Sequence, residues 1–340
     1  MISHSFPSYN EKVIYKAYEA LKNGNFSKRV ISDEAEKVLA QFTNARFSKL
    51  TASGFTALQS ALIGIGVQQG EYVTIPNVTC PSIYHAIKSI GAVPHVIDVG
   101  REQPIMSTES IKEQRASEYI IVPNMFGIKA SIDKVCFPNT KFIGDNAQCF
   151  SNQQNSWSDI SVYSFSPTKL MTVGYAGAII TDSELYKNRI ACFLDSEHSI
   201  YDNCPNDLTL PFRIHADISD FQAAMLIEQI KRFDQIIEFR EKIFSVYDTI
   251  IGKKRLYPEI PFRYQIILDE PEAEKIAKLL QEEGISAVPL SSHLLSDTFG
   301  IEGQFENSKW WKNHVISIPV HESISLDQSE WIAKKVREFI

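Results

Sequence analysis

The sequence predicts an α/β fold, with a mainly parallel central sheet covered by helices on both faces and a smaller α+β domain at the carboxyl end. Between residues 55 and 181, short apolar strands alternate with helical segments. Each strand is a continuous apolar run, which is typical of parallel strands buried on both faces. After residue 219 this alternation stops, and a long helical segment leads into a compact mixture of strands and helices.

Two helices are expected before the alternation begins. The pattern SYNE at 8–11 is that of a capping box, so we expect an amphipathic helix that runs to about Leu21 and ends at Asn23-Gly24. A second helix is expected at 33–42. The alternating part then predicts helices at 55–65, 82–89 and near Glu109, a helical turn from Ser131, and strands at 72–75, 94–99, 119–122, 141–144, 161–165 and 177–181.

The carboxyl-terminal part is expected to form a second domain. It begins with one long helix over 219–250, whose apolar residues recur at helical spacing. We place the boundary near Phe239, which gives a large domain of 1–238 and a small domain of 239–340. The small domain is predicted to contain strands at 264–268, 285–289 and 315–318, and helices at 272–283 and from Ser325 or Leu326 onward.

Charge and cysteine usage exclude several classes of function. A net charge of −7 disfavours nucleic acid or an anionic membrane as the main partner. No apolar run reaches the roughly 18 residues of a membrane span, and the first residues have no apolar signal core, so we expect a cytoplasmic protein. The five cysteines are scattered and form no C-x-x-C pair. We therefore expect reduced thiols rather than disulfides, and no metal site.

The segment 161–181 carries the most informative lysine. Its two apolar strands are joined by a loop with proline and glycine in which Lys169 is the only cation. A lysine held against apolar surface has a lowered pKa, so its free amine can act as a Schiff-base nucleophile. A surface-loop lysine explains the same pattern, so the neighbouring strand ends must decide between the two interpretations.

Unusual polar residues lie next to three apolar segments. They are Asp145 and Gln148 in FIGDNAQ, Ser164 in the strand before the lysine, and Ser53-Gly54 before the helix at 55–65. A carboxylate directly after an apolar strand needs a cation or a donor to stay ionised. A Ser-Gly pair at a helix start offers free N–H groups and a positive dipole end to a phosphate.

Each of these positions also has a plain structural explanation. Asp145 and Ser53 could be helix caps, and Ser164 an ordinary strand serine. Taken together with Lys169, however, they provide a carboxylate for a ring nitrogen, an amine for an aldehyde, and donors for a phosphate. These are the groups that pyridoxal 5′-phosphate (PLP) requires.

The same segments resemble the DegT/DnrJ/EryC1/StrS family of sugar aminotransferases over nearly the whole chain. FIGDNAQ is similar to the family's E-D-A-A-Q segment, SFSPTK to its S-F-x-x-x-K segment, and ISIPVHESIS to its S-L-P-x-H segment. Residues 53–99 resemble its phosphate-loop helix with the strand, helix and strand that follow, and 219–240 its long helix. The resemblance implies the fold type I, aspartate-aminotransferase-like PLP architecture.

The resemblance also assigns roles to single residues. Lys169 would form the Schiff base with PLP and then move the proton between the donor Cα and the cofactor. Asp145 would pair with the pyridinium nitrogen, and Gln148 would lie beside the cofactor. The phosphate would be held by Ser164, Ser53 and the amides of Gly54 and Phe55.

Five positions depart from the family pattern. Phe55 stands where threonine or serine is usual, so one hydroxyl for the phosphate is missing unless the neighbouring Thr56 supplies it. Cys80 stands where an aromatic residue usually stacks on the cofactor. Leu170 follows the lysine where asparagine is common. In 213–217, His215 and Asp217 replace the N-x-R pattern, whose asparagine reaches the phosphate of the neighbouring subunit. These departures leave the cofactor expectation intact but weaken the expectation about the substrate.

The resemblance implies a PLP-dependent aminotransferase. Its substrate would be a nucleotide-linked keto-sugar, which it would convert to an amino sugar with glutamate or glutamine as the amino donor. The resemblance further implies a homodimer with shared active sites, in which Arg213 or His215 reaches the partner's phosphate. Two alternatives stay open. One is PLP chemistry on another carbonyl or amino-acid substrate, and the other is a binding or regulatory protein that has lost turnover.

Overall fold

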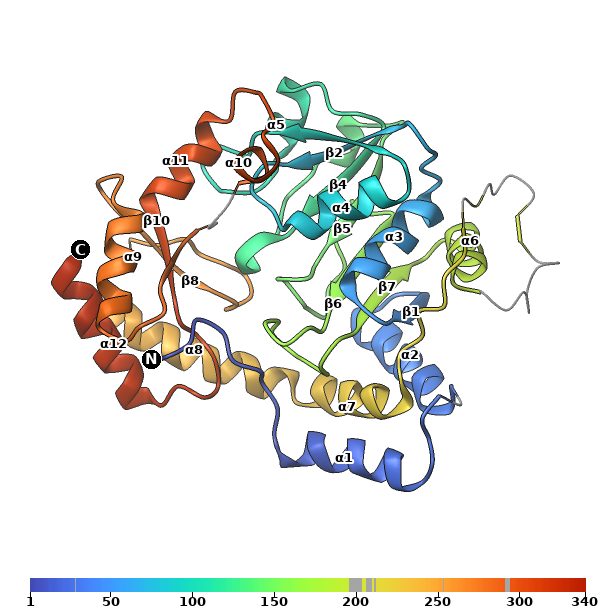
Figure 1. Ribbon diagram of the computed structural model, residues 1–340, viewed down its shortest axis with the longest axis horizontal. Helices are drawn as coiled ribbons and strands as arrows, with labels where there is room; N and C mark the ends of the chain where they lie inside the picture. The colour runs from blue at the N-terminus through green and yellow to red at the C-terminus, as the bar shows by residue number, and fades with distance from the viewer. Residues whose placement is uncertain (28, 196–203, 206–209, 211, 253, 291–293) are drawn as a thin grey trace.

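The computed structural model describes residues 1–340 except 28, 196–203, 206–209, 211, 253 and 291–293. Within these residues the chain forms a seven-stranded sheet, in the order β1-β7-β6-β5-β4-β2-β3, and a three-stranded sheet, in the order β8-β10-β9. Figure 1 shows the two sheets side by side, with α7 and α8 lying end to end along both.

The large sheet is mainly parallel, as the sequence predicts. Adjacent strands from β3 to β6 run parallel, and β7 is antiparallel to both of its neighbours. Strand β1 was not expected from the sequence, because its residues FSKLT lack an apolar run; it lies at the sheet edge with its first three residues partly exposed. The strands are β1 Phe47–Thr51, β2 Tyr72–Pro76, β3 Val93–Ile97, β4 Tyr119–Pro123, β5 Lys141–Asp145, β6 Ile160–Ser164 and β7 Gly177–Thr181.

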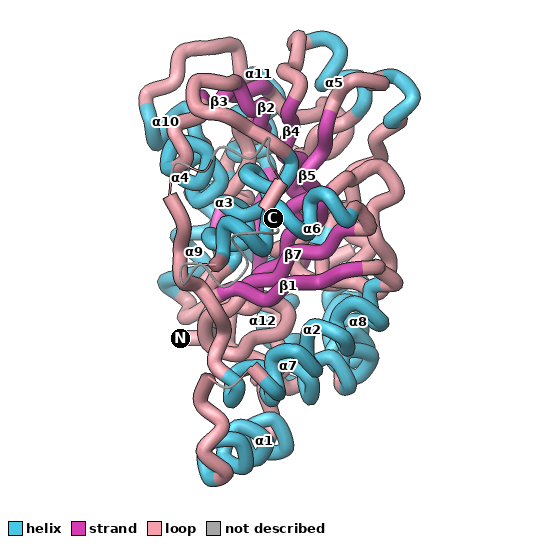
Figure 2. Tube along the Cα trace, turned by 90° about the vertical axis from the view of Figure 1, so that its right-hand side faces the viewer, coloured by secondary structure: helices cyan, strands magenta, loops and turns pink. Residues whose placement is uncertain are grey.

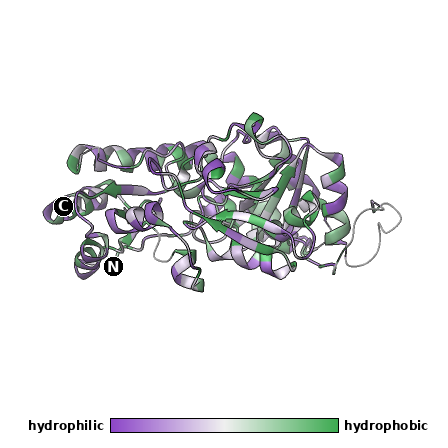
Figure 3. Cartoon of the chain, turned by 90° about the horizontal axis from the view of Figure 1, so that it is seen from above, coloured by the Kyte–Doolittle hydropathy of each residue, from purple (hydrophilic) through white to green (hydrophobic). Residues whose placement is uncertain are grey.

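Helices cover both faces of this sheet. Helices α3, α4 and α6 share one apolar core with the strands, and α2 and α7 share another on the opposite face, where α1 packs on α7. Figure 2 shows α2 and α7 next to β1, and Figure 3 shows hydrophobic residues concentrated in the strands between the helices. The elements are α1 Glu11–Lys22, α2 Val30–Thr43, α3 Gly54–Ile65, α4 Pro81–Ser89, α5 Thr108–Glu113, η1 Met125–Gly127, η2 Lys134–Cys136, α6 Glu184–Leu194 and α7 Asp220–Lys231.

The small sheet has its own core, shared with α8, α9 and α12. Residue Ile2 forms a bridge with Ile285, so the start of the chain lies against this part of the fold. The predicted domain boundary at Phe239 falls inside α8 and stays a prediction. The elements are α8 Phe233–Ile250, β8 Tyr264–Ile267, α9 Ala273–Glu282, β9 Val288–Pro289, α10 Leu295–Phe299, α11 Glu306–His314, β10 Val315–Ile318 and α12 Leu326–Phe339.

The prediction of one helix over 219–250 was wrong at a single residue. Arg232 leaves helical geometry, with φ −99° and ψ 8°, and separates α7 from α8. Its guanidinium donates to Glu322 Oε1 at 2.5 Å and to Ser8 Oγ at 3.2 Å. The apolar periodicity continues across this residue, so the pattern could not reveal the break. Ser8 itself is not the cap of α1, because Asn10 Oδ1 accepts the bond from the N–H of Val13.

The expectation of five reduced thiols was also wrong. Cys192 and Cys204 form a disulfide whose Cα atoms are 5.8 Å apart, while Cys80, Cys136 and Cys149 are free. A disulfide requires only that the two Cα atoms come close, and not a short sequence motif. The end of α6 and the segment after it provide that approach.

None of the helices in the described residues is both long and apolar enough to cross a membrane. In the same residues no group of three or more His, Cys, Asp or Glu side chains could hold a metal ion, and His198 and His293 lie outside them.

Candidate active site

A cavity of about 230 Å³ lies at the carboxyl ends of β4, β5 and β6, beside the amino ends of α3 and α4. Parallel strands end at the same edge of a sheet, and ligands of such folds gather there. Seven of the eight predicted site residues line this cavity: Gly54, Phe55, Cys80, Asp145, Gln148, Ser164 and Lys169. The structure therefore brings together residues that are separated by more than 100 positions in the sequence.

The loop that carries Lys169 is held at several points. Its backbone closes on itself through the N–H of Val173, which donates to the carbonyl of Phe165 at 3.1 Å. The amide of Gln229 donates to the carbonyl of Thr172 at 2.8 Å, and the buried side chain of Leu170 anchors the residue next to the lysine. The amine of Lys169 is thereby presented to the cavity from a fixed backbone.

Lys169 and Asp145 face the same small space with opposite charges. Burial lowers the pKa of Lys169, and the negative charge of Asp145 opposes this shift. Burial raises the pKa of Asp145. Two groups oppose this shift: the N–H of Ala147, which donates to Oδ1 at 2.8 Å, and the positive charge of Lys169. The carboxylate therefore needs a cation inside the cavity to stay ionised, and the lysine can lose its proton more readily than an exposed one.

The start of α3 forms a cradle of backbone N–H groups. Ser53 Oγ accepts from the N–H of Thr56 at 3.1 Å and lies 2.9 Å from Thr56 Oγ1, so Ser53 caps the helix and Thr56 is engaged with that cap. Among the described residues, the N–H groups of Gly54 and Phe55 donate to no other protein atom. Both residues line the cavity at the positive end of the helix dipole, which suits a phosphate.

Two glycines, Gly54 and Gly177, allow the start of α3 to lie close to β6 and β7. A Cβ on Gly54 would lie 2.8 Å from Ser164 Cβ. A Cβ on Gly177 would lie 2.3 Å from the carbonyl oxygen of Ser53 and 2.7 Å from the nitrogen of Gly54. Strand β7 therefore sets the position of the turn before α3, and the absence of side chains keeps the cradle open.

The remaining predicted residues occupy the walls. Gln148 Oε1 accepts from the N–H of Phe126 at 2.9 Å, which fixes the side-chain amide beside the cavity. Cys80 lies at the start of α4, where its sulfur accepts from Ser82 Oγ at 3.0 Å. Sequence reasoning missed Asn124, a fully buried lining residue directly after β4. The strand-end rule that selected Asp145 could have found it.

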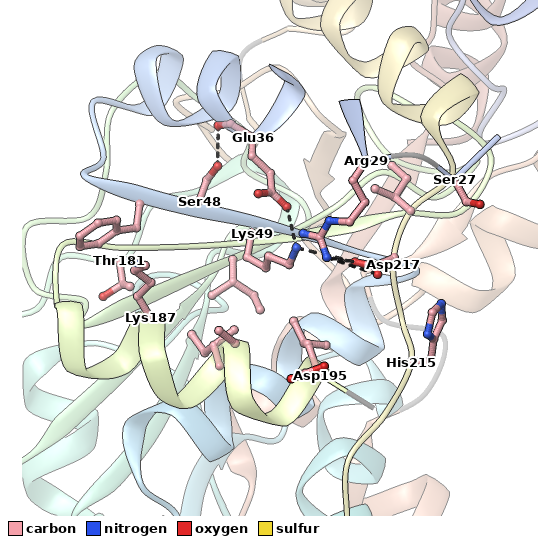
Figure 4. Close-up of a pocket in the computed structure, with 16 residues that line it drawn as sticks. Ser27, Arg29, Glu36, Ser48, Lys49, Thr181, Lys187, Asp195, His215 and Asp217 are labelled. Atoms are coloured by element: carbon pink, nitrogen blue, oxygen red, sulfur yellow. Dashed lines mark hydrogen bonds and ion pairs between the residues drawn. The ribbon is translucent and has the colours of Figure 1, made fainter. Parts of the chain in front are cut away.

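Arg213 and His215 lie apart from this cavity in their own chain. Arg213 donates to the carbonyl of Asp195 at 3.4 Å and contacts Cys204 Sγ at 3.6 Å. His215 lines a different cavity, of about 630 Å³, between α2, β1, β7 and α6. Figure 4 shows this larger cavity, where Asp217 pairs with Arg29 at 3.3 Å and with Lys49 at 3.6 Å. None of the predicted catalytic or cofactor-binding residues lines it.

Residues 7–337 match the model of the DegT/DnrJ/EryC1/StrS aminotransferase family. The chain belongs to this family. The match covers both sheets and every residue of the cavity around Lys169, so the DegT/DnrJ/EryC1/StrS assignment applies to the molecule as a whole.

Relatives of this aminotransferase family are similar along most of their length. A 3-oxo-glucose-6-phosphate:glutamate aminotransferase of Bacillus subtilis is 22% identical, over 94% of this chain and 78% of that protein. A UDP-4-amino-4,6-dideoxy-N-acetyl-beta-L-altrosamine transaminase of Campylobacter jejuni is 22% identical, over 98% and 96%. Among solved structures, the putative sugar aminotransferase Spr1654 of Streptococcus pneumoniae, in its PMP form, superposes with a TM-score of 0.86 at 18% identity, over 99% and 97% of the two chains.

Within the DegT/DnrJ/EryC1/StrS family pattern, the departures fall on identifiable contacts. Phe55 packs against the apolar core shared by α3 and α4, and Leu170 is buried in the core on the opposite face of the sheet. Thr56 does not supply the missing hydroxyl in this structure, because it bonds to Ser53 and does not line the cavity. The cradle therefore consists mainly of backbone N–H groups and Ser164.

Proposed function

We propose that this protein is a PLP-dependent aminotransferase that transfers an amino group from glutamate or glutamine to the ketone of a nucleotide-linked sugar. One observation carries the proposal: the amine of Lys169 and the carboxylate of Asp145 face one cavity whose wall also holds the free N–H groups at the start of α3. The names of the two relatives given above, a glutamate aminotransferase and a nucleotide-sugar transaminase, support the choice of donor and acceptor.

The residues divide the work of transamination among them. When bound, PLP supplies an electron sink next to the carbon that loses its proton. The amine of Lys169 would hold the aldehyde carbon of PLP, and the free amine would accept and return the proton at the donor Cα, which its lowered pKa favours. The carboxylate of Asp145 would stabilise a proton, and the positive charge it brings, on the ring nitrogen. Gly54, Phe55 and Ser164 hold the phosphate and fix the orientation of the ring.

A spectrum of the purified protein tests this proposal. Bound PLP should give a visible absorbance band that disappears with L-glutamate or L-glutamine and returns with a keto-sugar nucleotide. A band that no amino acid changes would instead support the regulatory alternative, which the aromatic-to-cysteine change at Cys80 favours. A band that responds to amino acids but never to sugar nucleotides would favour a different carbonyl substrate.

Gly177→Ala should weaken PLP binding without unfolding the protein. The new methyl group would collide with the Ser53 carbonyl and push the turn before α3 out of place. Overpacking of this kind costs about 1–3 kcal/mol, and a distortion of the cradle of that size should raise the dissociation constant for PLP by roughly 5- to 150-fold. Titration of the cofactor-free protein with PLP, together with a thermal melt, measures both effects. Unchanged PLP affinity in the variant would show that the turn can shift without consequence for the cradle.

We also propose that the working unit is a homodimer with shared active sites. Phe55 leaves the phosphate cradle with one hydroxyl fewer than the family pattern, which a donor from a second subunit would replace. Helix α1 supports the dimer independently, because Ile14, Tyr15 and Tyr18 are each about half exposed on its surface. The predicted cytoplasmic location stays a prediction.

Light scattering on the PLP-loaded protein should give twice the mass of one chain. His215→Ala and Arg213→Ala should then be compared for retention of PLP during dialysis, with Arg101→Ala as an exposed control. A fully loaded, active monomer would exclude shared sites. A dimer in which both variants retain PLP as well as the control would keep the dimer but remove these residues as donors.

A further inference from the structure

A second cavity, of about 180 Å³, adjoins the one that holds Lys169. The two cavities share Gln148, Thr168 and Lys169 as lining residues. The far wall of the second cavity comes from the small sheet and from the start of the chain, and includes Arg263 and His4. A group bound there would therefore reach the reacting lysine from the side of the small sheet.

Arg263 is a cation without a carboxylate partner among the described residues. One of its terminal nitrogens donates to the carbonyl of His4 at 3.1 Å, and the other to Ser5 Oγ at 2.7 Å. No acidic side chain in that part of the chain lies within ion-pair distance of it, and no acidic residue lines the second cavity. Because a guanidinium has five N–H donors, these two bonds leave donors available to a ligand.

The surroundings make this charge costly in the protein alone. Burial, reinforced by the positive charge of Arg240, lowers the pKa of Arg263 to about 9, so the side chain is still a cation at neutral pH. Arg240 is itself fully buried and donates to the carbonyls of Pro261 and Phe262 at 3.3 and 3.2 Å. His4 contributes no compensating negative charge. Because the positive charge of Arg240 acts on Arg263 and no acidic residue lines the second cavity, an anion bound there would offset the cost of this charge.

We propose that Arg263 binds the α-carboxylate of the amino donor. This inference rests on the proposed function and adds the residue that recognises the donor. In an amino acid the α-carboxylate is attached to the same carbon as the reacting amine, so the two groups must lie close together. The shared walls of the two cavities provide that proximity between Arg263 and Lys169. The phosphates of a nucleotide sugar, by contrast, are separated from the ketone by the sugar ring.

The start of the chain holds the guanidinium in position. His4 and Ser5 supply its two acceptors, and the chain on either side of them is tied down. On one side Ile2 pairs with Ile285; on the other, the carbonyl of Ser8 accepts from Gln229 Nε2 at 2.5 Å. Gln229 also bonds to the loop of Lys169, so one side chain links the two sides of the donor site.

The test compares Arg263→Gln and Arg263→Lys with the wild type and with Arg255→Gln. Arg255 lies near the same small sheet but pairs with Asp248 and lines neither cavity, so it controls for the loss of a charge. Two quantities are measured on PLP-loaded protein. One is the affinity for glutarate, a dicarboxylate without a reactive amine, by calorimetry. The other is the half-saturating concentration of L-glutamate and of 4-aminobutanoate, which lacks the α-carboxylate, by the loss of the visible band.

Loss of a charge-assisted, paired hydrogen bond should weaken glutarate binding roughly tenfold to a hundredfold in Arg263→Gln, and by a smaller factor in Arg263→Lys. The half-saturating concentration of L-glutamate should rise by a similar factor, while that of 4-aminobutanoate stays the same. Unchanged glutarate affinity in a folded Arg263→Gln or Arg263→Lys protein would overturn the inference. A wild type that reacts with no amino donor would instead refute the proposed function, which keeps the two failures distinct.

Discussion

Replacing Lys169 with alanine is expected to abolish transamination. The variant loses both the amine that binds the cofactor and the base that moves the proton at the donor Cα, and general acid-base catalysis alone contributes about 10²–10⁴-fold. The loss should therefore reach at least that range in kcat. Because Asp145 and the N–H groups before α3 remain, the variant should still bind PLP noncovalently.

Peptide mapping identifies the lysine directly. Reduction of the PLP-loaded wild type with borohydride should leave the pyridoxyl group on Lys169, and a label on another lysine would show that the assignment is wrong. Lys187→Ala is the matched control, since Lys187 lies in the larger cavity shown in Figure 4. Its activity should equal that of the wild type, whereas a severe loss would move the active site to that cavity.

Asp145→Asn is expected to lose several kcal/mol of transition-state stabilisation, which is measured as a lower kcat. The affinity for PLP should fall much less. The side chain keeps its shape, and the N–H of Ala147 can still bond to its oxygen. The variant loses the negative charge that would keep the ring nitrogen of PLP protonated, and with it part of the stabilisation that proton removal at the donor Cα would need. Burial increases the effect, because no water replaces the missing charge.

Single-turnover measurements with L-glutamate separate the rate of the chemical step from the affinity for PLP in this variant. Asp159→Asn is a suitable control. Asp159 lies just before β6, forms an ion pair with Lys134 and lines neither cavity. If Asp145→Asn retained most of its kcat, the carboxylate would only cap the turn that follows β5.

The sequence contained most of the site because the chemistry sits at strand ends. Asp145 and Ser164 are the last residues of β5 and β6, and the apolar runs before them were visible in the sequence. The parallel order of those strands then brings the two ends together. The same rule, applied to β4, leads to Asn124. Local sequence patterns thus predict site residues that directly end or follow a recognisable strand.

The rest depended on contacts between distant segments. Nothing near Arg263 in the sequence shows that its acceptors are His4 and Ser5, more than 250 positions earlier. The break at Arg232 follows from Ser8 and Glu322 in the same way. The edge strand β1 was missed because its partner β7, and not its own hydrophobicity, makes it a strand.

The bridge between Ile2 and Ile285 has a practical consequence for anyone who prepares this enzyme. The N–H of Ile2 donates to the carbonyl of Gly284 and its carbonyl accepts from the N–H of Ser286, so the first residues pair with the segment between α9 and β9. An affinity tag fused ahead of Met1 would have to leave beside this pairing, close to His4, whose carbonyl helps to position Arg263. The opposite terminus ends with α12 on the outer side of the small sheet, as Figure 1 shows, and is the safer place for a tag.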